Sequence, residues 1–185
     1  MTSVAGGPGQ LTLSPADRAA AIAAVKAQAR IETGYDDALI AAFAETAIGL
    51  AEQFTGRALI VRTMTATLPA GEGWQALPVA PVRAITAVAA GVPPVALAAE
   101  AFTVDIDARA TGWVRAAGIA GPLSVTFEAG LASGWAALPP ALAQGVALLA
   151  AHLMDDRTGA TPPPAAVTAL WRPFRVMALA TEVRA

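Results

Sequence analysis

The chain of 185 residues carries a formal net charge of −2, and 56% of its residues are hydrophobic whereas only 14% are charged. This length suits one domain with its own core better than two. The lack of a basic run argues against stable nucleic-acid binding, and the absence of cysteine excludes disulfides and thiolate metal sites. So apolar a chain is typical of a protein that buries surface against other subunits, although a GC-rich genome would produce the same alanine-rich composition.

A membrane-spanning or exported protein is not expected. The longest stretch without a charged side chain covers residues 129–154, but glycines and prolines interrupt it. The uninterrupted part after Pro140 is shorter than the roughly 20 apolar residues that a spanning helix needs. The first basic residue is Arg18, so the N-terminus has no basic n-region, and no apolar h-region of a signal peptide follows. A signal peptide is therefore not expected either. The sequence therefore predicts a protein that is made in the cytoplasm and has no membrane contact.

The first part of the chain predicts an arm and two helices. Residues 1–13 are rich in glycine and are expected to form a flexible arm. Ser14, as an N-cap followed by a proline, begins a helix over residues 14–30. A second helix is expected over residues 36–55, because apolar side chains recur at helical spacing and Gly56 comes next as a C-cap. Its predicted apolar stripe comprises Leu39, Phe43, Ala47, Leu50 and Phe54.

The middle of the chain changes to a two-residue period. Over residues 58–68, β-branched residues dominate one side of the alternation, which indicates a strand. Glycines and prolines punctuate the later segments. Residues 58–129 are therefore expected to form a small, mostly antiparallel β region. Its further candidate strands are residues 74–77, 82–89, 102–106, 113–116 and 123–129.

Helix returns over residues 140–157, where leucine and valine side chains recur at spacings of three and four. Three prolines at 162–164 form a stiff linker, and a short helix is expected over residues 165–171 before Pro173 ends it. The sequence thus predicts an α+β fold, in which a small helical bundle carries an inserted antiparallel β region between its second and third long helices.

The predicted domain organisation is built from these elements. One domain is expected over residues 14–160. The arm precedes it, and a C-terminal part over residues 161–185 contributes the proline linker, the short helix and a tail without clear periodicity.

Residues that could carry chemistry are few, and their spacing does not form a catalytic pattern. His152 is the only histidine, and it shares a helix face with Asp156. One imidazole beside two carboxylates is a poor metal-ligand set, and a cation favoured by the helix dipole explains it better. The acidic pairs at 36–37 and at 105 and 107 are explained by helix capping and by strand alternation. We therefore expect no catalytic residues, no cofactor and no metal.

Three stretches of the chain resemble, in order and spacing, the head–tail connector (adaptor) family of tailed phages and gene transfer agents. The first is similar to the family's acidic helix start and helix exit, the second to a proline-flanked strand, and the third to a strand followed by a helix. They read DDALI and AEQFTGRALI within residues 36–60, LPVAPVRAITAV in residues 77–88, and VTFEAG, LPPAL and HLMDDR within residues 125–157. No single motif is specific by itself, but their order and spacing are.

The resemblance implies a structural subunit of a particle's neck and not an enzyme. It implies a homo-oligomeric ring, a dodecamer matching the portal, that docks on the portal protein and continues the DNA channel to the tail. DNA would pass without sequence-specific binding, and a downstream stopper or tail neck protein would come after the ring. Such a protein is part of the virion after synthesis in the host cytoplasm. Two alternatives stay open: a stopper or tail-completion protein, and a small-molecule-binding or enzymatic domain.

The segment after the proline linker is the candidate portal-binding site. It mixes aromatic and arginine side chains, which are enriched at protein interfaces, and the prolines would hold it away from the bundle. Alternatively, the short helix folds back onto its own bundle and covers the core. The candidate residues are Leu170, Trp171, Arg172, Pro173, Phe174 and Arg175.

Overall fold

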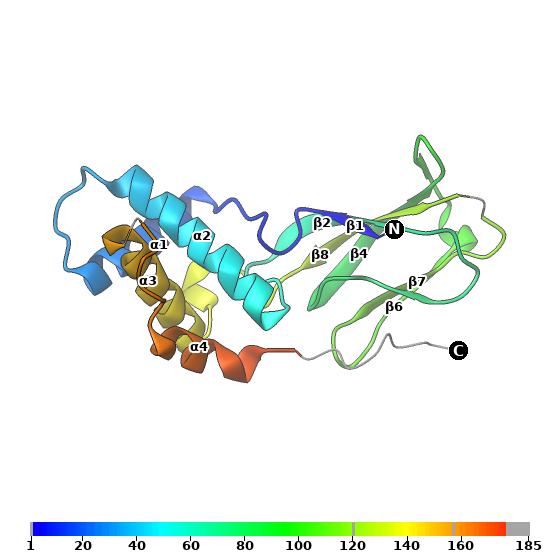
Figure 1. Ribbon diagram of the computed structural model, residues 1–185. Helices are drawn as coiled ribbons and strands as arrows, with labels where there is room; N and C mark the ends of the chain where they lie inside the picture. The colour runs from blue at the N-terminus through cyan, green and yellow to red at the C-terminus, as the bar shows by residue number, and fades with distance from the viewer. Residues whose placement is uncertain (1, 120, 157, 177–185) are drawn as a thin grey trace. The chain divides into compact units, whose positions relative to one another are not determined.

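The chain forms a helical unit and a β unit, and the β unit is inserted into the sequence of the helical unit (Figure 1). The helical unit comprises residues 8–60 and 132–176, and the β unit comprises residues 2–7 and 61–131. This organisation confirms the predicted α+β fold, with an antiparallel β region between the second and third long helices. The computed structural model describes residues 2–119, 121–156 and 158–176.

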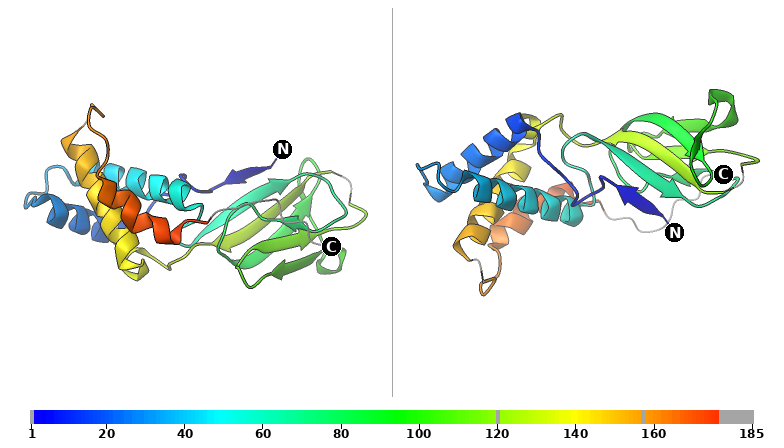
Figure 2. Two further views of the ribbon diagram at one scale, coloured as in Figure 1. Left: turned by 60° about the horizontal axis from the view of Figure 1, so that its bottom comes forward. Right: turned by 90° about the horizontal axis from the view of Figure 1, so that it is seen from above.

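The helical unit contains the four predicted helices, which pack against one another (Figure 2). Their bounds agree with the sequence-based expectation to within two residues. A 3₁₀ turn precedes the third helix, and another continues the fourth. The elements are α1 (Pro15–Ala29), α2 (Asp37–Thr55), η2 (Trp135–Ala137), α3 (Pro140–Asp155), α4 (Ala165–Trp171) and η3 (Arg172–Phe174).

The ends of α1 and α2 are determined by their local sequence. The hydroxyl of Ser14 accepts a hydrogen bond from the backbone N–H of Asp17 at 3.2 Å, and this satisfies a donor of the first turn of α1. The C-cap residue of α2, Gly56, has a φ of 69°, a conformation that glycine adopts without a Cβ penalty.

The buried face of α2 differs from the predicted apolar stripe. Its core side presents small residues such as Ala44 and Ala51 together with Ile40 and Ile48, all fully buried. Leu50, a member of the predicted stripe, is 42% exposed. The alanines allow α1 and α3 to approach α2 closely. The buried face of α2 is therefore determined by the close packing of small residues and not by the positions of its largest side chains.

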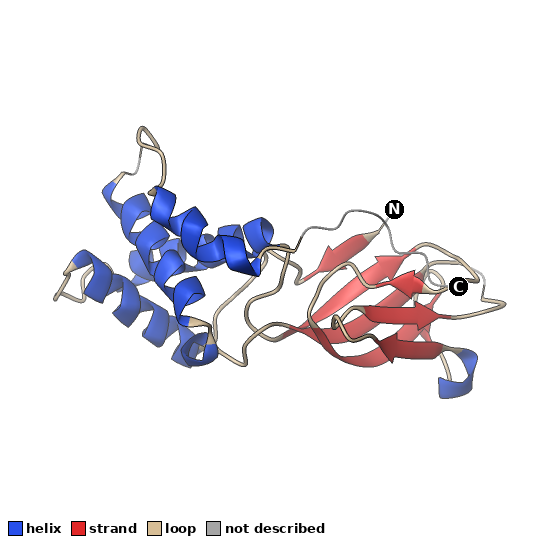
Figure 3. Ribbon diagram, turned by 90° about the horizontal axis from the view of Figure 1, so that it is seen from below, coloured by secondary structure: helices blue, strands red, loops and turns tan. Residues whose placement is uncertain are grey.

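The β unit contains two antiparallel sheets (Figure 3). One has five strands in the order β1-β2-β8-β4-β5, and the other has three in the order β3-β7-β6. All six predicted strand segments form strands. The strands are β1 (Ser3–Ala5), β2 (Arg62–Leu68), β3 (Gln75–Ala76), β4 (Val82–Ala90), β5 (Val95–Ala96), β6 (Thr103–Ile106), β7 (Gly112–Arg115) and β8 (Leu123–Ala129).

Strand β8 is the centre of the larger sheet and of its core. It pairs along its whole length with β2, where Met64 lies opposite Phe127, and with β4 on its other edge. The side chains of Met64, Val125 and Phe127 are at most 1% exposed, whereas Thr65 and Thr126 alternate with them. The predicted two-residue period in β2 is therefore confirmed, and it places the apolar side of the strand on the core.

The N-terminal residues differ from the expected flexible arm. Ser3–Ala5 forms strand β1, which pairs with β2 and places Val4 opposite Ala66. The guanidinium of Arg62 donates to the carbonyl oxygens of Gly6 at 2.7 Å and Gly7 at 2.9 Å. Pairing with the edge of β2 and the hydrogen bonds from Arg62 thus order this segment. Both partners are distant in sequence, so the glycine-rich local sequence could not predict them. Strand β5 was also not predicted, because two prolines precede it.

Within the described ranges, none of the helices is long and apolar enough to cross a lipid bilayer.

Candidate functional site in the C-terminal segment

The C-terminal segment, defined here as residues 165–176, lies on the helical unit. Helix α4 packs against α3 and contacts α2. Its inward side chains are Val167 and Trp171, which are 2% and 3% exposed. The indole N–H of Trp171 donates to the carbonyl oxygen of Leu142 in α3 at 3.4 Å. The short helix therefore covers part of the bundle core, and its tryptophan is one of the core residues.

A second row of contacts joins this segment to the end of α2. The ring centroids of Phe54 and Trp171 lie 6.0 Å apart at an interplanar angle of 52°, a tilted arrangement in the favourable range. The guanidinium carbon of Arg175 lies 5.5 Å from the centroid of the Phe54 ring, within cation–π distance. Phe54 thus contacts two side chains of the second half of the segment, Trp171 and Arg175.

The backbone closes the attachment. The N–H of Val176 donates to the carbonyl oxygen of Thr55, the last residue of α2, at 2.8 Å. The buried hydroxyl of Thr55 donates in turn to the carbonyl of Ala51 at 2.7 Å. One of the otherwise unpaired carbonyls at the end of α2 is thereby satisfied by the C-terminal segment.

The six candidate portal-binding residues divide by exposure. Arg172, Pro173 and Arg175 are exposed, Leu170 and Phe174 are half-buried, and Trp171 is buried. Trp171 cannot enter a pocket on a partner while the segment stays on the bundle. Of the two sequence-based expectations, the structure has the second, in which the short helix folds back and covers the core.

The linker before α4 begins in a well hydrogen-bonded turn. The carboxylate of Asp156 accepts hydrogen bonds from the hydroxyls of Thr161 and Thr158 and from backbone N–H groups of both threonines and of Ala160. The Thr161 hydroxyl, together with that of Thr158, holds the pKa of Asp156 well below its usual range. His152 lies in the same turn, with Nε2 at 3.2 Å from the carbonyl oxygen of Thr161. Asp156 and His152 thus organise the start of the linker.

Other acidic residues named by the sequence also have local partners. Burial raises the pKa of Asp107, but hydrogen bonds from the Trp113 indole and from the backbone of Thr111 and Arg109 outweigh it, so the pKa lies below its usual value. This carboxylate shapes the β6–β7 turn. Among the described residues, no group of three histidine, cysteine or acidic side chains could hold a metal ion.

The capping explanation for the acidic pair at 36–37 needs correction. Asp36 occupies the N-cap position of α2 but makes no side-chain capping bond, and its backbone conformation is not extended. Asp37 instead forms an ion pair with Lys26 of α1. The ion pair between Asp37 and Lys26 therefore contributes to the contact between α1 and α2, and the acidic residues do not serve mainly as a cap of α2.

Glu52 is a structural residue that sequence reasoning missed. It is fully buried in α2, where Oε1 accepts the N–H of Leu59 at 2.9 Å and Oε2 accepts the N–H of Gly9 at 3.1 Å. The available signal was an acid in helical register with the buried residues Ile48 and Thr55. The distant partner Gly9 had no such signal.

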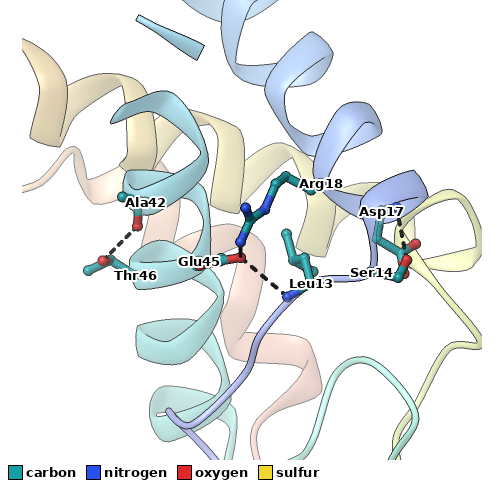
Figure 4. Close-up of polar contacts among 7 residues, drawn as sticks. All are labelled: Leu13, Ser14, Asp17, Arg18, Ala42, Glu45 and Thr46. Atoms are coloured by element: carbon teal, nitrogen blue, oxygen red, sulfur yellow. Dashed lines mark hydrogen bonds and ion pairs between the residues drawn. The ribbon is translucent and has the colours of Figure 1, made fainter. Parts of the chain in front are cut away.

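Two further carboxylates attach α1 to the rest of the helical unit. Glu45 Oε1 accepts the N–H of Leu13 at 3.3 Å and pairs with the guanidinium of Arg18 at 2.7 Å (Figure 4). Asp17 Oδ1 accepts the N–H of Trp135 at 2.6 Å, across 118 residues of sequence. Each acid therefore holds backbone from a distant part of the chain.

No protein-family model matches the chain, and no curated protein sequence does. Solved structures do match. A chain in the neck of an empty gene transfer agent particle, computed with C6 symmetry, is 30% identical, with 100% of both chains covered and a TM-score of 0.73. A chain in the neck of a native particle, computed with C12 symmetry, is 30% identical over 94% of this chain and 97% of that chain, with a TM-score of 0.67. A chain in the virion of a native gene transfer agent is 28% identical over 98% of both, with a TM-score of 0.67.

The α+β fold, matched over 94% and 100% of the chain by two neck chains, defines a structural protein of the neck of a phage-like particle. The chain belongs to the head–tail connector (adaptor) family, to which the three sequence stretches were similar.

Proposed function

We propose that this chain assembles into a twelve-membered ring that docks on the portal protein, continues the DNA channel toward the tail and has no enzymatic activity. The observation that carries the proposal is the full-length likeness to chains in neck structures with C6 and C12 symmetry. A closed ring needs two different faces on each subunit, and an apolar chain with 14% charged residues suits such contacts.

Portal docking is assigned to the outward side of the C-terminal segment. Arg172, Pro173 and Arg175 are exposed there, beside the half-buried Phe174. Arginine can pair with carboxylates of a partner in a bidentate geometry. Trp171 contributes by fixing the segment on the bundle, so that these side chains are presented in one orientation.

DNA passage and the absence of catalysis are supported by the charge of the chain and by its acidic residues. A net charge of −2 and a sequence without a run of basic residues argue against a protein that retains DNA. His152, Asp107 and Asp156 make local hydrogen bonds that account for their positions. A stopper or tail neck protein would bind the ring on the side away from the portal.

Native mass spectrometry of the protein mixed with its portal protein tests the proposal. We expect a complex with equal numbers of portal and adaptor subunits. A protein that stays monomeric in this mixture and does not associate with the portal would refute the function.

The docking face is tested by Arg172→Glu. Because Arg172 is exposed, the variant should fold as the wild type does, whereas portal affinity should fall by roughly tenfold or more through charge repulsion. Arg109→Glu makes the same charge change at an exposed site of the β unit and serves as the control. Equal portal binding by both variants would remove the C-terminal segment as the docking face and leave the ring proposal in place.

A further inference from the structure

The last turns of α2 accept hydrogen bonds from backbone N–H groups near both ends of the described chain. Glu52 accepts the N–H of Gly9 at 3.1 Å and that of Leu59 at 2.9 Å through its two carboxylate oxygens. Three residues later, the carbonyl of Thr55 accepts the N–H of Val176 at 2.8 Å. The N-terminal segment, defined as residues 8–13, and the C-terminal segment are therefore attached within one helical turn of each other.

The N-terminal segment packs closely against this part of α2. A Cβ atom at Gly49 would lie 3.3 Å from the Cα of Gly9, and a Cβ atom at Gly9 would lie 2.8 Å from Nε2 of Gln53. Gly9 also has a φ of 85°, a left-handed conformation that favours glycine. The contact therefore depends on the absence of side chains at two positions that face each other.

The chain segments on either side of the β insertion are tied to the same place. The N–H of Ala132 donates to the carbonyl of Leu59 at 2.9 Å, and Ile60 forms a parallel β-bridge with Ala132. The two described ranges of the helical unit begin at Pro8 and Ala132 and end at Ile60 and Val176. Gly9, next to Pro8, and Leu59, next to Ile60, donate to Glu52, and Val176 donates to Thr55. Ala132 is linked to Glu52 through its hydrogen bond to Leu59.

We propose that residues 49–55 of α2 form a clamp that couples the N-terminal segment to the C-terminal segment, with Glu52 as its positioning residue. Release of either segment then loosens the other, because both hold the same turn of helix in place. If the C-terminal segment docks on the portal, as proposed above, the clamp also makes docking depend on the N-terminal segment. The coupling itself does not rest on that function.

Amide hydrogen exchange in the free, full-length protein tests the coupling in both directions. Glu52→Gln replaces one carboxylate oxygen by an NH₂ group, so a backbone N–H that donates to this oxygen loses its acceptor. We expect exchange at Gly9 and Leu59, and with them at Val176, to accelerate by about tenfold. In the reverse direction, Phe54→Leu removes the ring between Trp171 and Arg175, and it should accelerate exchange at Gly9.

Controls separate coupling from a general loss of stability. Glu45→Gln lies on the same helix and loosens Leu13, but it should leave Val176 unchanged. The amides of Val25 and Val146, both in the core, should stay protected in every variant. Gly49→Ala would place a Cβ atom 3.3 Å from the Cα of Gly9 and provides the test if Glu52→Gln does not fold. Faster exchange at Gly9 with unchanged Val176, or an equal effect of Glu45→Gln on Val176, would overturn the proposal.

Discussion

A Cβ atom at Gly145 in α3 would lie 2.3 Å from Nε1 of Trp171 in α4, so the indole fills the space that any larger residue at position 145 would need. We predict that Gly145→Ala displaces α4 from the bundle. Overpacking of this kind costs about 1–3 kcal/mol, and the better helix propensity of alanine offsets up to about 1 kcal/mol of that loss. Denaturant unfolding would measure the difference.

Gly73→Ala is the matched control for this substitution. A Cβ atom at Gly73 meets no atom within 4 Å, and its backbone is not in the left-handed region. Its free energy of unfolding should equal that of the wild type or exceed it slightly. An equal loss in both variants would show that the effect at position 145 is not steric.

Trp171→Ala should reverse the sign of the effect at position 145. Truncation of a buried tryptophan costs about 3–5 kcal/mol. In that background the clash is gone, so Gly145→Ala should stabilise the protein by about 0.5–1 kcal/mol through helix propensity alone. A double-mutant cycle measures this coupling, and a Gly145→Ala effect that stays destabilising would contradict it.

Asp17 should contribute more to stability than Ser14, although both belong to the start of α1. Ser14→Ala removes the capping bond from the Asp17 N–H and the bond from the Ser14 hydroxyl to the Asp17 carboxylate, both of them exposed, and should cost about 1 kcal/mol. Asp17→Ala removes the acceptor of the Trp135 N–H and of the Ser14 hydroxyl, and a hydrogen bond to a charged group contributes about 1.5–3 kcal/mol. Chemical denaturation of both variants checks the order. Equal losses would mean that the bond to Trp135 adds no stability.

The turn around Asp156 should withstand acid. Its pKa is lower in the folded protein than the value of about 3.9 in an unfolded chain, so ionisation favours the fold above that value. The contribution is lost only as the pH falls toward the folded-state pKa. NMR chemical shifts of the Ala160 and Thr161 amides should stay constant through about pH 4 and change only in stronger acid. Asp156→Asn is the control, and a wild-type midpoint near the unfolded value of about 3.9 would contradict the prediction.

The parts of the fold that could be predicted from the sequence are those governed by local rules. Residues such as Ser14 and Gly56 marked the helix bounds, and a two-residue period marked the strand β2. Strand β1 was missed because its order depends on a partner edge and on Arg62, 56 residues from Gly6. Local composition cannot report such a partner.

The candidate site shows the same division. The short helix and its mixed aromatic and arginine composition were visible in the sequence. The side of the helix that turns inward was not, because it depends on the empty position at Gly145 and on Phe54 in another helix. Glu52 could be noticed as an acid on a buried face, but its partner Gly9 is known only once α2 and the N-terminal segment lie together.

The position of the β unit within the sequence also sets an order of events during synthesis. Strand β8 lies between β2 and β4 in the sheet but comes after both in the chain, so the five-stranded sheet cannot close before residues 123–129 have left the ribosome. Helices α1 and α2 emerge much earlier, and they remain without their packing partner α3 for longer, because α3 begins only at Pro140. During that interval α1 and α2, which contain the buried residues Val25 and Ile48, lack the third helix against which both of them pack. The nascent chain therefore passes through a stage in which the apolar face of α1 and α2 is uncovered and the five-stranded sheet is incomplete. Chaperones would act on the chain at this stage.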